Sequence, residues 1–159
     1  MLRFTICFII KGSELLMLNR NKAPNKGLWN GVGGKINAGE TPEQCIVREV
    51  AEETGLQIKK PRFTGTVQWE NDNRLIGGMY VFVFHLDKDT TYPTPVKVDE
   101  GLLDWKSIDW LLEVDNAGVV SNIRFFLTDM LKDPEPSEYH CYYISGKLNG
   151  VRKMELSQM

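Results

Sequence analysis

The stretch GGKINAGETPEQCIVREVAEETGL, residues 33–56, contains a pair of glycines, five glutamates and one arginine. Its second half carries the signals of a helix over residues 42–54. Thr41 is a suitable N-cap, Gln44 completes a capping box with it, and Gly55 supplies a C-terminal stop. The sequence therefore predicts a helix of defined length that follows a glycine-rich segment.

The predicted helix has two faces of different chemistry. At about 100° per residue, one face is apolar and would pack against a sheet; it carries Ile46, Val47 and Val50. The other side carries Glu49, Glu52 and Glu53. A solvated acidic face is the common explanation for such a cluster, but a solvated face ordinarily includes lysines, and Arg48 is the only basic residue of this helix. Because like charges at this spacing destabilise a helix, a bound cation is the better explanation.

A hard divalent cation suits this cluster. Mg²⁺ prefers oxygen ligands and is typically held by one or two carboxylates, several waters and the phosphates of a substrate. The pair Gly33-Gly34 would let the main chain pass close to such a ligand, where a side chain would clash. Arg48 could pair with Glu40 or Glu52 and hold a carboxylate in place, and Lys35 could meet phosphate oxygens.

Two better-known glycine-rich phosphate sites do not fit this segment. In GVGGK, residues 31–35, Ile36 stands where the dinucleotide-binding GxGxxG pattern needs its third glycine. A Walker A loop is also excluded, because Trp29 stands five residues before Gly34 and Ile36 follows Lys35. The spacing therefore argues against a Rossmann enzyme and against a P-loop NTPase.

Outside this segment the chain alternates β-rich runs with turns. Strands are expected over residues 3–10, 14–19, 28–32, 57–69, 74–86 and 102–105, and a closing hairpin over 139–156. Residues 70–73 are expected to form a hairpin turn, residues 87–100 a loop, and residues 121–132 a second helix capped by Ser121. The pair Gly77-Gly78 predicts a bulge or a close backbone approach. A single mixed α/β domain is the prediction for residues 1–159.

Composition limits the possible partners and compartments. The 159 residues carry a net charge of −2, which argues against a polymeric nucleic acid as partner but allows a small phosphorylated ligand bound with a metal. The three cysteines have no CxxC spacing, so a reducing compartment fits best. The apolar run near the N-terminus is short and has no cleavage site, and we expect a cytoplasmic protein without a membrane span.

The spacing of the glutamate segment resembles the Nudix box. Gly34, five residues, Glu40, seven residues and then REVAEETGL, residues 48–56, match that motif at every defined position. The resemblance implies an α/β/α sandwich around a mixed β-sheet, with the box at residues 34–56. It also implies hydrolysis of a nucleoside diphosphate linked to a further group, with Mg²⁺, or alternatively Mn²⁺, as cofactor.

The same resemblance implies roles for individual residues. It gives the metal ligands as the carbonyl of Gly34 with Glu49, Glu52 and Glu53. It gives the catalytic residues as Glu53, Glu52, Arg48 and Glu100. Glu53 is the expected general base, Arg48 and Glu40 form an orienting pair, and Glu100 is similar to a downstream glutamate that many members bring to the metal. An exposed loop acid is the alternative explanation for Glu100.

The flanking segments are similar to MutT-like enzymes that clear oxidised purine nucleotides such as 8-oxo-dGTP from the nucleotide pool, a part of DNA repair. In that group an asparagine at the position of Asn30 contacts the purine edge. Where some members carry an aspartate pair, this chain has SNIRFF, with Asn122 as the nearest match. The expected substrate-binding residues are Asn30, Lys35, Gly33 and Asn122. A turn asparagine before Gly31 is the alternative explanation for Asn30.

Two other functions stay open at this stage. The first is a Nudix hydrolase of another nucleoside diphosphate derivative, such as a dinucleoside polyphosphate or a nucleotide sugar. The second is a non-catalytic Nudix domain that binds a nucleotide as a regulatory module. The expected partner in each case is a small nucleotide, with neither a nucleic-acid polymer nor a membrane.

Overall fold

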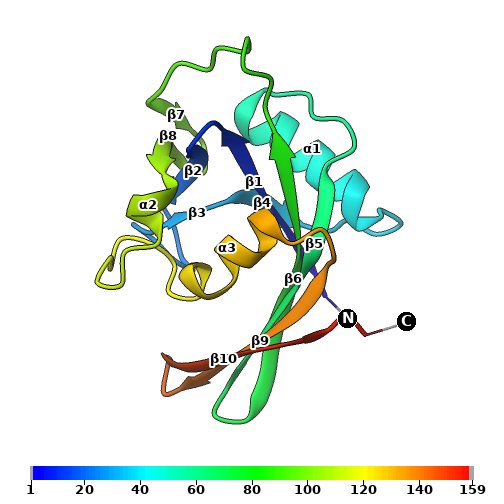
Figure 1. Cartoon of the computed structure of the whole chain (residues 1–159), viewed down its shortest axis with the longest axis vertical. Coiled ribbons are helices and arrows are strands. Elements are labelled where there is room, and N and C mark those ends of the chain that lie inside the picture. Colours follow the sequence, from blue (N-terminus) through cyan, green and yellow to red (C-terminus); the bar gives the residue numbers. More distant parts are fainter. Residues whose placement is uncertain (1, 158–159) are drawn as a thin grey trace.

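The computed structural model describes residues 2–157 (Figure 1). Strand β1 lies in the interior of its sheet. The strands are β1 (Phe4–Lys11), β2 (Glu14–Arg20), β3 (Trp29–Asn30), β4 (Val32–Lys35), β5 (Arg62–Asn71), β6 (Arg74–His85), β7 (Val96–Val98), β8 (Gly101–Ser107), β9 (Ser137–Ile144) and β10 (Lys147–Glu155). The helices are α1 (Pro42–Thr54), α2 (Ile108–Leu111) and α3 (Ile123–Lys132).

These strands form one mixed sheet in the order β10-β9-β5-β6-β1-β2-β8-β7, with β3 paired to β2 and β4 paired to β1. The pairs β1/β6 and β5/β9 are parallel, and the remaining neighbours are antiparallel. The closing hairpin β9–β10 is thus part of the same sheet as the glycine-rich strand β4.

Apolar residues on both faces of β1 explain why helices cover both sides of the sheet. Ile6 and Phe8 point into one core, which α3 completes with Ile123, Phe126, Leu127 and Met130. Cys7 and Ile9 point into the other core, which α1 completes with Ile46 and Val50. A strand buried on both faces reads as a continuous apolar run, as β1 does. The predicted α/β/α sandwich around a mixed sheet is confirmed.

The helix that carries the glutamates forms as its local signals predict. The Thr41 hydroxyl accepts from the Gln44 amide at 3.1 Å, and the Gln44 side chain accepts from the Thr41 amide at 2.9 Å. Gly55 ends the helix with φ at 80°, a left-handed conformation that favours glycine. Capped at both ends and anchored by its apolar face, α1 holds its glutamates at a fixed edge of the sheet.

The long hairpin β5–β6 also follows the sequence, with a tighter turn than expected. Asp72 and Asn73 form a two-residue turn with φ at 50° and 66°, which suits a type I′ hairpin. The register shifts next to Trp69, and a Cβ placed on Gly77 would lie 2.7 Å from the Trp69 ring. The predicted bulge and close approach at Gly77-Gly78 are both present.

Other boundaries differ from the sequence-based expectations. The helix predicted over residues 121–132 is α3, and it begins at Ile123. Its N-cap is Asn122, which makes no side-chain cap bond, so Ser121 does not cap it. Strand β5 begins at Arg62 and not at residue 57, since residues 57–61 lie outside any strand. The expected loop 87–100 contains β7, and the short helix α2 was missed. Each of these depends on long-range pairing or on a single turn of helix.

None of the helices formed by residues 2–157 is long and apolar enough to cross a membrane.

Candidate active site

Three of the four glutamates of α1, Glu49, Glu52 and Glu53, form the acidic cluster, and they differ in how far they are buried. The Glu52 side chain is 60% exposed, whereas that of Glu49 is 15% exposed. Glu53 is half-buried, and its buried Oε2 has no hydrogen-bond partner among residues 2–157. An unpartnered buried carboxylate oxygen is costly in a folded protein, so this atom is the first indication of a ligand.

The glycine pair of β4 lets the backbone approach these carboxylates. A Cβ placed on Gly34 would lie 2.4 Å from the Cδ of Glu49, and one on Gly33 would lie 2.0 Å from the carbonyl oxygen of Thr5. Gly33 requires glycine because the clash would be with backbone, whereas a side chain at Gly34 would push the Glu49 carboxylate out of its position. The carbonyl oxygen of Gly34 accepts a long contact of 3.4 Å from the Thr5 hydroxyl.

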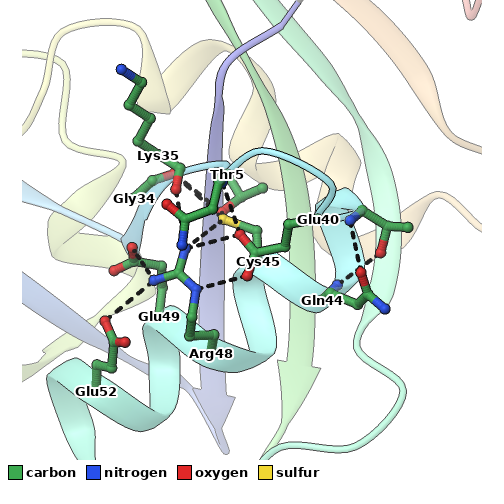
Figure 2. Close-up of polar contacts among 11 residues, drawn as sticks. Thr5, Gly34, Lys35, Glu40, Gln44, Cys45, Arg48, Glu49 and Glu52 are labelled. Carbon is green, nitrogen blue, oxygen red and sulfur yellow. Dashed lines mark hydrogen bonds and ion pairs between the residues drawn. The ribbon is translucent and has the colours of Figure 1, made fainter.

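Arg48 is the centre of the polar network around the glutamates (Figure 2). Its Nε and Nη2 donate to the Glu40 carboxylate at 2.7 Å and 2.9 Å. Its Nη1 donates to Glu49 at 2.9 Å and to Glu52 at 3.3 Å. Nη2 also donates to the carbonyl of Lys35 at 3.1 Å. Arg48 therefore ties the helix to β4 and fixes two of the three glutamates.

The electrostatics of this network keep Arg48 and Glu40 charged. The hydrogen bonds from Arg48 and the backbone amide of Asn37 lower the pKa of Glu40 to about 2. The same pairing with Glu40 raises the pKa of Arg48. A bidentate arginine–carboxylate pair is rigid as well as strong, so it suits an orienting role.

Glu53 behaves in the opposite way. Burial, followed by the negative charge of Glu49 and a hydrogen bond with it, raises the pKa of Glu53 to about 8. The charge of Glu100 adds to this effect, and the charge of Arg20 opposes it. A carboxyl group with so high a pKa in a cleft is typical of a functional site, because a bound cation would relieve both causes.

The acidic cleft over α1 is completed by the turn between β7 and β8. It has a volume of about 190 Å³ and is lined by Glu49, Glu52, Glu53, Val98, Asp99 and Glu100. The structure thus brings Glu100 to the glutamates of the box, about 50 residues away along the chain. Glu100 therefore lines the same cleft as Glu49, Glu52 and Glu53, and its role there stays a prediction.

The donors of this cleft fit a hard cation that completes its shell with water and phosphate. Within residues 2–157, no three His, Cys, Asp or Glu side chains converge closely enough to hold a metal ion by themselves. Mg²⁺ and Mn²⁺ do not require that, because they commonly take a few protein oxygens together with waters and substrate phosphates. The unpartnered oxygen of Glu53 and the close approach of Gly34 to Glu49 supply such oxygens.

A much larger cavity, of about 1130 Å³, lies beside α3 and the hairpins β5–β6 and β9–β10. Its walls combine amides with apolar and aromatic groups, among them Asn30, Trp69, Met79, Asn122, Phe125 and Tyr143. Binding pockets for organic ligands usually have this mixture of an apolar lining and a few polar groups.

Both predicted base-reading asparagines line this cavity. Asn122 is only 5% exposed, and its Oδ1 has no hydrogen-bond partner. Asn30 is half-buried and its Oδ1 accepts from the amide of Gly31 at 2.8 Å, so it also has the local turn bond expected of an asparagine before glycine. The side-chain nitrogen of Asn30 stays available for a ligand.

Lys35 is placed less favourably. Its side chain is exposed and points away from Glu49 and Glu52 in Figure 2, and its carbonyl is the part that joins the Arg48 network. The structure therefore does not bring the ammonium group of Lys35 together with the box glutamates.

Sequence reasoning missed several residues around these cavities. Arg20, at the end of β2, carries a positive charge that lowers the pKa of Glu53. Asp99 lines the acidic cleft. Met79 lines the larger cavity. Spacing could not have singled them out, because they reach these sites only through strand pairing.

Comparison with known proteins agrees with this geometry. The family model described as NUDIX domain matches residues 1–133. An oxidized purine nucleoside triphosphate hydrolase of Danio rerio is 30% identical over 106 residues, which is 66% of this chain and 65% of that protein. An NAD-capped RNA hydrolase NudC of Haemophilus influenzae is 39% identical over 75 residues, 46% of this chain but only 28% of that protein.

Solved structures support the same fold. A MutT protein of Bacillus halodurans superposes with a TM-score of 0.75 at 23% identity, covering 96% of this chain and 97% of that one. At this identity the likeness concerns the fold. The family model spans most of the chain, and Glu49, Glu52 and Glu53 of the box line one cleft, with Arg48 bonded to the first two. The chain belongs to the Nudix family.

Proposed function

We propose that this protein is a metal-dependent hydrolase that cleaves a purine nucleoside triphosphate into a monophosphate and pyrophosphate. Oxidised guanine nucleotides such as 8-oxo-dGTP are the preferred substrates in this proposal. The observation that carries it is the buried, unpartnered carboxylate oxygen of Glu53, in an acidic cleft on the same sheet as a large amide-lined cavity. The first feature suits the phosphates with their cation, and the second suits the base.

The residues that would hold Mg²⁺ or Mn²⁺ are the carbonyl of Gly34 with Glu49, Glu52 and Glu53, and Glu100 adds a further carboxylate. When bound, the cation offsets the charge of the phosphate oxygens and makes a water more acidic. Arg48 keeps Glu49 and Glu52 in position through the contacts described above.

The protein's own part in the reaction is to orient the substrate and move one proton. Glu53 would serve the cation through Oε2, and its other carboxylate oxygen accepts a proton from the attacking water. The water oxygen forms a bond to phosphorus, the P–O bond between the α- and β-phosphates breaks, and pyrophosphate leaves. Arg48 and Glu40 stay paired throughout, since their interaction serves geometry and not proton transfer.

Recognition of the base would fall to Asn122 and Asn30. An amide offers a donor and an acceptor side by side, which suits a purine edge. Oxidation of guanine changes its pattern of donors, so a buried amide left unpaired by the wrong base would disfavour it by about 1–3 kcal/mol. The likeness to the Danio rerio hydrolase of oxidized purine nucleoside triphosphates supports this choice of substrate.

A second substrate class is favoured by the size of the cavity. About 1130 Å³ exceeds what one purine base fills, which leaves room for a nucleoside diphosphate derivative with a second large group. A dinucleoside polyphosphate or a nucleotide sugar belongs to this class. The chemistry at Glu53 would be the same.

The compartment follows from the substrate. An enzyme that clears the nucleotide pool acts in the cytoplasm, and the three cysteines are buried and free, as suits a reducing environment.

A hydrolysis panel with Mg²⁺ tests the proposal. It compares 8-oxo-dGTP, dGTP, the other nucleoside triphosphates, a dinucleoside polyphosphate and ADP-ribose, with Glu53→Gln as the control. We expect 8-oxo-dGTP to have the highest kcat/KM and the variant to be inactive on every substrate. Faster turnover of another compound would move the substrate assignment to the second class, and binding without any turnover would support a regulatory domain.

A further inference from the structure

The end of strand β2 pairs with the turn that brings Asp99 and Glu100 to the acidic cleft. Residues 19–21 run alongside the turn that carries Asp99 and Glu100, and the ladder pairs Arg20 with Gly101. This contact fixes where Glu100 lies relative to α1.

Asn21 holds that turn with two hydrogen bonds. Its backbone amide donates to the carbonyl of Glu100 at 3.0 Å, and its side-chain Nδ2 donates to the carbonyl of Asp99 at 2.9 Å. Two successive carbonyls are thus bound by a single residue, which fixes the orientation of the peptide units on which the Glu100 side chain depends.

The next residue of the turn shows how closely it docks on β2. Gly101 has φ at 150°, and a Cβ placed on it would lie 1.8 Å from the carbonyl oxygen of Asn19. No side chain fits there. The turn and the strand end therefore meet along residues 99–101 on one side and 19–21 on the other.

The end of β2 also bonds the segment that leads to the larger cavity. The Asn19 side chain donates to the carbonyl of Gly27 at 3.1 Å, and the amide of Arg20 donates to the carbonyl of Leu28 at 3.3 Å. Leu28 and Asn30 line that cavity. The end of β2 therefore holds one segment of each cavity: Asn19 bonds the loop before the larger cavity, and Asn21 bonds the turn at the acidic cleft.

We propose that Asn21 is a positioning residue that places Glu100 over the glutamates of α1 and thereby strengthens divalent-cation binding. The inference rests on the proposed function, in which Glu100 serves the cation. Asn21 acts only through Glu100, because its side chain is exposed and its amide nitrogen donates to the turn, at the carbonyl of Asp99.

The test measures cation affinity directly, as free Mn²⁺ in an EPR titration of the full chain without nucleotide. The variants are Glu100→Gln, Asn21→Ala, both together, and Asn19→Ala as the matched control on the same strand. We expect Glu100→Gln to weaken Mn²⁺ binding by about 10-fold. Asn21→Ala should weaken it by about 3- to 10-fold, the equivalent of one hydrogen bond. The double variant should equal Glu100→Gln, and Asn19→Ala should bind Mn²⁺ normally.

A purely structural role for Asn21 predicts different results. It would lower the thermal stability but leave Mn²⁺ affinity unchanged, and added Mn²⁺ would not restore kcat. In our proposal, saturating Mn²⁺ restores the kcat of Asn21→Ala. Gly101→Ala, which pushes the turn off β2, should weaken Mn²⁺ binding in the same direction.

Three outcomes would overturn the positioning role. In the first, Asn21→Ala binds Mn²⁺ as the unmodified protein does. In the second, Asn21→Ala weakens binding even when Glu100 is already replaced. In the third, Glu100→Gln has no effect, which also removes Glu100 from the proposed metal site. Hydrolysis as the proposed function fails separately, if the unmodified chain neither binds Mn²⁺ nor hydrolyses nucleotides, or if Glu53→Gln stays active.

Discussion

At the scale of single residues, Glu53 links the stability of the protein to its function. Its pKa of about 8 in the folded chain lies above the ordinary value of 4.5, so the folded protein holds a proton there that the unfolded chain releases. Stability therefore falls as pH rises from 4.5 to about 8, and the loss is complete above that range. A carboxylate kept for function at the expense of stability shows this pattern.

Glu53→Gln should accordingly stabilise the metal-free protein while it abolishes hydrolysis. In EDTA at pH 8 we expect a gain on the order of 2 kcal/mol in the free energy of unfolding, shrinking to nothing near pH 4.5. Urea unfolding at several pH values measures it. Added Mg²⁺ should reverse the order, because the cation stabilises only the chain that keeps the carboxylate. If the variant is instead less stable at pH 8 in EDTA, the buried Glu53 carboxylate does not lower the stability of the metal-free protein.

Asn122 provides a second residue-scale prediction, on specificity. Asn122→Ala should reduce kcat/KM for 8-oxo-dGTP by about 10-fold, the effect of one lost hydrogen bond to a base. Oδ1 has no partner among residues 2–157, but the same side chain hydrogen-bonds Cys141 and Tyr143, so the variant should also lose some stability and its kinetics are compared per folded molecule. Asn122→Asp is the matched control, since it keeps the acceptor oxygen. Steady-state kinetics with 8-oxo-dGTP and dGTP checks the result, and equal losses on both substrates would argue against a role in discrimination.

At the scale of elements, α1 is set by its own caps. Thr41→Ala removes the hydroxyl that accepts from the Gln44 amide, and we expect a loss of about 1 kcal/mol in the free energy of unfolding. Thr41→Ser should retain most of it. Activity per folded molecule should not change, because Ile46 and Val50 anchor the helix independently of its cap. Denaturant unfolding and kcat measured together test this, and a parallel fall of kcat would mean that the cap positions the glutamates.

Elements with local signals were predictable, and elements that depend on distant partners were not. Thr41 and Gly55 specify the ends of α1 within the helix itself, so the box could be read directly. Strand β7 exists only because it pairs with β8, and the start of α3 moved from Ser121 to Ile123 through its tertiary setting. Residue identity alone does not encode such pairings.

The candidate site divides in the same way. Gly34 in β4, Arg48 and the glutamates of α1 could be singled out because they lie in one continuous stretch of sequence, residues 34–53. Glu100 and Asn122 came from resemblance, and the structure places the first at the cleft and the second at the cavity. Arg20 and Asn21 could not be foreseen, since they matter only where β2 meets the turn before β8.

At the scale of the whole molecule, two cavities of opposite character share one sheet. The cleft over α1 is small and acidic, whereas the cavity beside α3 is large and mostly apolar with amides. A nucleotide that uses both would place its phosphates with the cation at one and its base at the other. The net charge of −2 gives no general attraction to a phosphate chain.

The two cavities should therefore be separable by metal removal. In EDTA, 8-oxo-dGMP should bind with nearly unchanged affinity, because its single phosphate need not reach the glutamates. The triphosphate 8-oxo-dGTP should lose about 10- to 100-fold in affinity, since its added charge meets the acidic cleft without a cation. Calorimetry of the unmodified chain measures both ligands, with an α,β-methylene analogue that resists hydrolysis in place of the triphosphate, and quenching of Trp69 in the cavity provides a second signal. If the monophosphate also requires metal, the two cavities act as one site, whereas equal triphosphate binding in EDTA would place the phosphates away from α1.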